Sequence, residues 1–215
     1  MKQLGALITF EGLDGCGKTT QLELEAERLR QQGHAVTATK EPGGTRVGRA
    51  IREIVLNAEN GPLCASTELA LMLAARAQHI EKVIRPALLA GGIVLCDRFT
   101  DSTIAYQGYG RGVPLDHLET LDLILCHGFP TDLTLLLDID PETSADRTFR
   151  RNRAAHQAET RFEEEGLEFF HRVRQGYLEI AQREPQRVKI VDAKGGIPEL
   201  QMRVSRCVDE FLKQR

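Results

Sequence analysis

The chain of 215 residues has a net charge of -3, and 41% of its residues are hydrophobic. That apolar content is enough for one core, so we expect a single domain over residues 1–215. The slightly acidic balance argues against a protein that holds duplex nucleic acid through its phosphates. Five widely spaced cysteines indicate a reducing compartment, and no apolar run has the length of a membrane span or a signal peptide core. We therefore expect a cytoplasmic protein with no membrane partner.

Short apolar runs rich in branched residues recur along the chain and indicate strands that are buried on both faces. They lie at 6–10, 35–39, 93–96, 133–139 and 188–191. Between them the sequence predicts helices at 18–32, at 67–89 and from 140 onward. Strands that alternate with helices predict an α/β fold, a three-layer sandwich around a parallel sheet, with ligands at the carboxyl ends of the strands.

The segment FEGLDGCGKTT follows the first predicted strand and precedes the first predicted helix. It contains a complete G-x-x-x-x-G-K-[ST] motif, whose small residues let backbone amides surround phosphate at a helix N-terminus. Lys18 is expected to reach the β- and γ-phosphates, and the Thr19 hydroxyl to hold Mg2+. Cys16 could be a small residue in a small space or a thiol activated by the helix, and we favour the first. The predicted triphosphate-binding residues are Gly12, Asp14, Gly15, Cys16, Gly17, Lys18, Thr19 and Thr20.

A second motif, IVLCDRF, is a buried strand that ends in Asp97 and is followed at once by Arg98. Asp97 can orient Mg2+ directly or through water. A GTPase should also carry the guanine-reading N-K-x-D, and the sequence contains no Asn-Lys pair. We therefore discount a GTPase switch.

Six segments, in their order and spacing, resemble the bacterial thymidylate kinase family, which phosphorylates dTMP to dTDP. They are FEGLDGCGKTT, KEPGGT (40–45), AIREIV (50–55), ARAQH (75–79), CDRFTDSTIAYQGYGRG (96–112) and TRFEEE (160–165). The resemblance covers almost the whole chain. It implies a P-loop nucleoside monophosphate kinase fold, ATP and Mg2+ as cofactors, dTMP as the small-molecule acceptor in dTTP synthesis, and a homodimer formed through helices.

The acceptor phosphate needs positive charge around it but no general base, because it is already an ionised nucleophile. Arg52, Arg76 and Arg98 lie at or near the ends of predicted elements, where they could converge on one phosphate, as the resemblance implies. The alternative for each is a solubilising surface arginine. That alternative is weakest for Arg76, because it lies in the apolar stretch LMLAARAQHI and burying an unpaired guanidinium is costly.

If residues 99–107 are helical, Ser102, Thr103 and Tyr106 share one face. By resemblance, Thr103 and Gln107 lie against the thymine edge, and Tyr106 lies beneath the sugar, where it would crowd a 2'-hydroxyl. The resemblance also assigns the sugar 3'-hydroxyl to Asp14. The predicted substrate-binding residues are Asp14, Glu41, Arg52, Met72, Arg76, Arg98, Ser102, Thr103, Tyr106 and Gln107.

Three positions depart from the family pattern. Met72 stands where many relatives have an aromatic ring that stacks on thymine, and a thioether cannot stack. Lys40 stands where arginine is common. The segment 160–163 reads Thr-Arg-Phe-Glu where relatives often show Asp-Arg.

The arginine-rich segment 147–161 could be a solvated helix end and loop or a mobile cationic lid. The phosphate loop has the acidic residue Asp14 and no arginine. We therefore expect an arginine of the lid to stabilise the phosphoryl group during its transfer, and we favour Arg153. We place adenine near Arg147 and the backbone at 192–194. The predicted catalytic residues are Lys18, Asp97, Arg98 and Arg153, and the predicted metal ligands are Thr19 and Asp97.

Two rival functions stay open. A deoxynucleoside kinase also pairs a phosphate loop with a carboxylate after the second strand, and there Glu41 would act as general base. A nucleotide-dependent regulatory or assembly module would bind ATP without making a small-molecule product. Three candidate phosphate-binding arginines and the CDRF sequence favour the monophosphate kinase over the nucleoside kinase. Stimulation of ADP formation by dTMP would distinguish it from the regulatory module.

Overall fold

Five parallel strands form one sheet in the order β2-β3-β1-β4-β5 in the computed structural model, which describes residues 5–155 and 165–215. The strands are β1 (Ala6–Glu11), β2 (Val36–Lys40), β3 (Ile93–Asp97), β4 (Leu133–Asp138) and β5 (Val188–Asp192). Each falls on a predicted strand, within one residue at either end. The central strands β1 and β3 are buried at every position, as expected for apolar runs that are covered on both faces.

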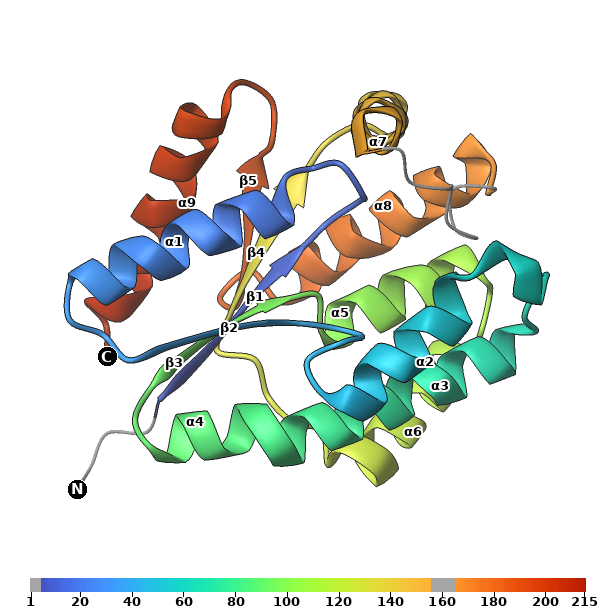
Figure 1. Ribbon diagram of the computed structural model, residues 1–215, viewed down its shortest axis with the longest axis horizontal. Helices are drawn as coiled ribbons and strands as arrows, with labels where there is room; N and C mark the ends of the chain where they lie inside the picture. The colour runs from blue at the N-terminus through green and yellow to red at the C-terminus, as the bar shows by residue number, and fades with distance from the viewer. Residues whose placement is uncertain (1–4, 156–164) are drawn as a thin grey trace.

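Helices cover both faces of this sheet, so the predicted three-layer α/β sandwich is confirmed (Figure 1). The α-helices of the described ranges are α1 (Lys18–Gln31), α2 (Arg46–Leu56), α3 (Ala65–His79), α4 (Arg85–Leu89), α5 (Thr100–Thr103), α6 (Leu115–Cys126), α7 (Pro141–Ala155), α8 (Leu167–Arg183) and α9 (Ile197–Leu212). Figure 1 shows α1 and α9 together on one side of the sheet and α3, α4 and α8 on the other. None of the helices in the described ranges could cross a membrane.

Successive side chains of β1 contribute to two apolar clusters. Ile8 and Phe10 belong to a cluster that includes Leu22 of α1. Leu7, one position away, belongs to a second cluster with Ile80 and other apolar residues of the helices on the opposite face. Because successive residues of a strand point to opposite faces, one apolar strand supplies both layers.

Two predicted helices contain wider π-helical turns, which the sequence did not predict. The first, at 80–84, precedes Pro86, which lacks the amide hydrogen that an α-helix would donate to residue 82. The second, at 104–110, follows α5. Its Gly108 and Gly110 have no room for a side chain, because a Cβ would lie 2.7 Å from Leu115 and 2.6 Å from Phe169. The helical conformation considered for 99–107 is thus present from Thr100 onward, as an α-helix to Thr103 and a π-helix after it.

The strand order places β1 between β3 and β4, with the phosphate-loop segment directly after β1 and Asp97 at the end of β3. Because the strands are parallel, their carboxyl ends meet at one edge of the sheet. The helix α7, which begins at a cap formed by Asp140 and the Thr143 amide at 2.8 Å, follows β4 at the same edge. The sequence motifs are therefore gathered at this edge.

Candidate active site

The loop between β1 and α1 has the backbone conformation of an anion-binding loop. Gly12 and Gly15 have positive φ angles of 133° and 75°, which residues with a Cβ rarely adopt. Space is limiting as well, since a Cβ at Gly12 would collide with the carbonyl oxygen of Leu137. The helix α1 begins at Lys18, so its positive N-terminal end adds to the loop amides.

Lys18 lies folded over this loop, with its Nζ donating to the carbonyl oxygens of Gly12 at 3.0 Å and Leu13 at 2.8 Å. The Asp14 carboxylate is 4.0 Å from the same Nζ. Within the loop, Cys16 is fully buried, and burial raises the pKa of its thiol. The structure therefore agrees with Cys16 as a small packing residue and not as an activated thiol.

The Thr19 hydroxyl donates to Asp97 Oδ2 at 2.6 Å. This contact brings a hydroxyl and a carboxylate together beside the phosphate loop, and hard oxygen ligands of this kind suit Mg2+. In the described parts of the chain, no group of three His, Cys, Asp or Glu side chains could hold a metal ion by itself. The pair therefore fits a Mg2+ that is completed by phosphate oxygens and water.

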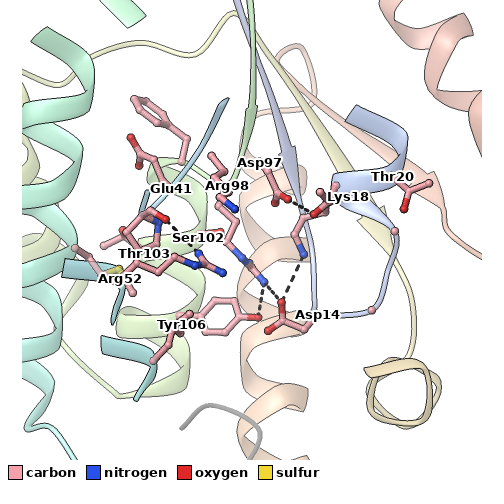
Figure 2. Close-up of a pocket in the computed structure, with 18 of the residues that line it drawn as sticks. Asp14, Lys18, Thr20, Glu41, Arg52, Asp97, Arg98, Ser102, Thr103 and Tyr106 are labelled. Atoms are coloured by element: carbon pink, nitrogen blue, oxygen red, sulfur yellow. Dashed lines mark hydrogen bonds and ion pairs between the residues drawn. The ribbon is translucent and has the colours of Figure 1, made fainter. Parts of the chain in front are cut away.

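Arg98 follows β3 and is held from several directions. Its NH2 donates to Asp14 Oδ1 at 2.8 Å and to the Tyr106 hydroxyl at 3.1 Å, and its guanidinium lies 4.8 Å from the centre of the Tyr106 ring (Figure 2). Its NH1 donates to the hydroxyls of Ser102 and Tyr177, each at 3.1 Å. Arg98 itself has a φ of 70°, an unusual value for a residue with a side chain and one found at functional sites.

The charges in this group are coupled. Burial opposes ionisation of Asp14, but Arg98 and Lys18 together hold the pKa of Asp14 well below its usual range. Behind Arg98, the buried Glu11 accepts hydrogen bonds from Ser102 Oγ at 2.5 Å and Tyr177 OH at 3.1 Å. Burial, and then the neighbouring Asp101, raise the pKa of Glu11 to about 7. Glu11 therefore fixes the hydroxyls that in turn fix Arg98.

Arg52 and Arg76 are held by different partners, and Arg52 NH1 donates to the carbonyl oxygen of Pro42 at 3.2 Å. Burial lowers the pKa of Arg52, and the nearby charge of Arg98 lowers it further. Figure 2 shows the side chains of Arg52 and Arg98 pointing into the pocket. The Arg76 Nε donates to Glu41 Oε2 at 2.8 Å, and its NH2 donates to Thr103 Oγ1 at 2.8 Å. Its NH1 is buried and has no hydrogen-bond partner in the part of the chain that the structure describes. The structure thus groups Arg52 with Arg98, and Arg76 with Thr103.

A cavity of about 640 Å3 connects these groups, a volume typical of small-molecule sites. All of the predicted substrate-binding residues line it. The other predicted residues that line it are Gly15, Gly17, Lys18, Thr19, Thr20, Asp97 and Arg147. The sequence-based prediction therefore assembled residues that share one cavity, although they come from widely separated segments.

Known proteins match the chain over nearly its full length. The model of the family described as thymidylate kinase matches residues 10–204. The chain belongs to the thymidylate kinase family. It is 47% identical to thymidylate kinase of Geotalea uraniireducens over 206 residues, 95% of this chain and 97% of that protein. The corresponding values for thymidylate kinase of Trichlorobacter lovleyi are 49% over 187 residues, 86% and 88%.

A solved structure supports the same assignment. The crystal structure of thymidylate kinase from Ehrlichia chaffeensis matches with a TM-score of 0.75 and 33% sequence identity, over 95% of this chain and 98% of that one. The predicted P-loop nucleoside monophosphate kinase fold is confirmed by this match and by the parallel sheet.

The arginines of the predicted lid line two different hollows. The helix α7 continues to Ala155 and so includes the first part of the segment 147–161. Arg153, which we favoured for the transferring group, lines a neighbouring hollow of about 530 Å3, whereas Arg151 lines the main cavity. The charge of Arg151 also helps to keep the pKa of Asp14 low. The remainder of the lid, 156–161, lies outside the described residues.

Two acidic residues that hold the site in place, Glu68 and Glu11, were not predicted from the sequence. Glu68 is fully buried and accepts a hydrogen bond from Gln107 Nε2 at 2.8 Å. The one signal for Glu68 was its position in the otherwise apolar segment TELALMLAA, because a carboxylate in a packed helix requires a partner. For Glu11 the sequence carried no signal beyond its place at the end of a buried strand.

Proposed function

We propose that the chain transfers the γ-phosphoryl group of ATP to the phosphate of dTMP, giving ADP and dTDP. The observation that carries this proposal is the pair of cationic sites on one cavity: Lys18 with the phosphate loop, and Arg98 with Arg52. A transfer between two nucleotides requires positive charge around both polyanions. An ATPase or a GTPase would need only the first of these sites.

On the donor side, the phosphate loop and Lys18 bind the triphosphate. Thr19 and Asp97, together with phosphate oxygens, would hold Mg2+, which would neutralise charge on the β- and γ-phosphates. Arg147 donates to the carbonyl oxygen of Ala193 at 3.1 Å, so α7 and the segment after β5 lie together. This contact supports the expectation that adenine binds between them.

On the acceptor side, Arg98 and Arg52 hold the dTMP phosphate, whose oxygen attacks the γ-phosphorus in line. Because Arg98 is already fixed by Asp14 and Tyr106, little reorganisation is needed when the acceptor binds. Tyr106 lies against the deoxyribose, and Thr103 with Gln107 against the base. Either Arg151 or Arg153 stabilises the phosphoryl group during its transfer. We favour Arg151, because it lines the main cavity.

The state of Glu41 argues against the rival deoxynucleoside kinase. A hydroxyl acceptor needs a general base within hydrogen-bond reach. Both Glu41 oxygens are engaged, Oε2 by Arg76 Nε and Oε1 by His79 Nδ1, each at 2.8 Å, and the side chain is buried. Glu41 therefore serves better as an anchor for Arg76 than as a base.

The remaining expectations concern the whole molecule. We propose that the chain acts as a single kinase domain with a lid beginning near residue 147, in the cytoplasm, and as a homodimer. Support for a dimer comes from α6, where large apolar side chains are exposed: Leu121, Leu123, Ile124 and Leu125. Exposed apolar residues gathered on one helix are typical of an interface between proteins.

A coupled assay of ADP release, with ATP and Mg2+, tests the proposed reaction. The acceptors dTMP, dUMP, the ribose form of TMP and thymidine are presented in parallel, together with a reaction that lacks an acceptor. We expect dTMP to be strongly preferred. Turnover of thymidine but not dTMP would make the chain a nucleoside kinase, and ADP release that no acceptor stimulates would favour a regulatory ATPase.

A further inference from the structure

Glu68 of α3 is a carboxylate with no contact with solvent, beside the base end of the cavity. Arg111 supplies the positive charge that a buried carboxylate requires, with its NH2 3.2 Å from Oε2 and its Nε 3.3 Å from Oε1. Arg111 is anchored in turn by Glu165 and lies 4.8 Å from the centre of the Phe169 ring. Glu68 is therefore held in place as an acceptor of hydrogen bonds.

This acceptor determines the orientation of the Gln107 amide. An ionised carboxylate can only accept hydrogen bonds, so the amide nitrogen of Gln107 must face it, and Nε2 donates to Glu68 Oε1 at 2.8 Å. The carbonyl oxygen of the same amide therefore faces away from Glu68. Gln107 is 2% exposed and lines the cavity, so an acceptor is left for the ligand.

The hydroxyl of the neighbouring Thr103 is fixed as a hydrogen-bond donor toward the ligand. Its hydroxyl oxygen accepts from Arg76 NH2 at 2.8 Å, and the hydroxyl hydrogen is therefore left to donate. Arg76 cannot reverse this polarity, because a guanidinium has no acceptor. Beside Arg76, Thr103 thus offers the base a donor and Gln107 offers it an acceptor.

We propose that Glu68 is a specificity-determining positioning residue, which selects a pyrimidine that has a ring N-H next to a carbonyl. Thymine and uracil have this pattern, whereas cytosine presents a ring acceptor next to an amino donor and would face Gln107 acceptor to acceptor. The inference rests on the proposed function, in which Thr103 and Gln107 contact the base. It adds that Glu68 determines which atom of the Gln107 amide faces the base.

The test is the ratio of kcat/KM for dTMP to kcat/KM for dCMP in Glu68→Gln. The new amide can donate as well as accept, so the Gln107 amide is free to turn over, and we expect the ratio to fall about 10- to 100-fold. Glu25→Gln is the matched control: Glu25 is also fully buried, and it is held by Arg28 and by Gln201 Nε2 at 2.8 Å. It should lose similar stability with its selectivity unchanged.

A second substitution that restores the acceptor distinguishes an effect on hydrogen-bond direction from general damage to the site. In the double variant Glu68→Gln, Gln107→Glu, the carboxylate has moved to position 107, so an acceptor again faces the ligand and the preference for dTMP over dCMP should return. A folded Glu68→Gln protein with wild-type selectivity would overturn the proposal. If Glu68→Gln does not fold, Gln107→Leu decides, since retained selectivity without the amide contradicts the inference equally. Failure of the wild-type chain to phosphorylate dTMP would instead count against the proposed function.

Discussion

Replacing Arg98 by alanine tests the acceptor site most severely. The change removes a guanidinium that donates to Asp14 at 2.8 Å and leaves that carboxylate with Lys18 at 4.0 Å. Breaking a buried ion pair costs about 3–5 kcal/mol of folding stability, but the Asp14 side chain is 38% exposed, which reduces that cost. The effect on catalysis is separate: losing a charged donor to the acceptor phosphate should cost about 2–4 kcal/mol of transition-state stabilisation, so we expect a kcat/KM for dTMP that is about 30- to 1000-fold lower.

Steady-state kinetics with varied dTMP, together with direct titration of ATP binding, measure the two sites separately. We expect the affinity for ATP to be retained and the loss to appear with dTMP. Arg98→Lys is the matched control, because it keeps the charge and the backbone strain at the φ of 70° but loses the planar fork; its defect should be intermediate. Loss of ATP binding with an unchanged KM for dTMP would refute the placement of Arg98 in the acceptor site.

Three further predictions concern the metal, the lid and pH. Asp97→Asn should raise the Mg2+ concentration for half-maximal activity about 10- to 100-fold, and an unchanged Mg2+ titration would contradict the assignment. Arg151→Ala should lower kcat about 100-fold and more than Arg153→Ala does; the reverse order would restore Arg153. Because burial raises the pKa of Glu11 from 4.5 to about 7, its contribution to stability is complete below pH 4.5 and is lost as pH rises through 7. Urea unfolding should therefore show a decline of up to about 3 kcal/mol over this window that Glu11→Gln lacks, and equal slopes for both proteins would exclude it.

Much of the fold and of the phosphate loop could be predicted because the signals are local. A run such as ALITF at 6–10 is apolar on both faces, which is enough to indicate a buried strand in a parallel sheet. The phosphate loop needs only its own glycines and Lys18 at fixed spacing between a strand and a helix. The remaining site residues were grouped by family resemblance, and the structure brings them into one cavity.

The parts that could not be predicted depend on contacts distant in sequence or on helix phase. Glu68 and Gln107 are 39 positions apart, and no pattern in either segment indicates the partner. Arg151 and Arg153 are two positions apart on α7, where residues point in nearly opposite directions. Their segment lacks the apolar periodicity that would set the phase, so the sequence could not tell which of them faces the main cavity.

The central claim, direct transfer between two nucleotides in one cavity, is tested most directly by following the phosphoryl group itself. The protein is incubated with Mg2+, dTMP and ATP whose γ-phosphoryl oxygens carry heavy isotopes, and the products are separated and weighed by mass spectrometry. We predict ADP and dTDP in equal amounts, with the whole label on the β-phosphate of dTDP. Labelled inorganic phosphate with unchanged dTMP would contradict the account.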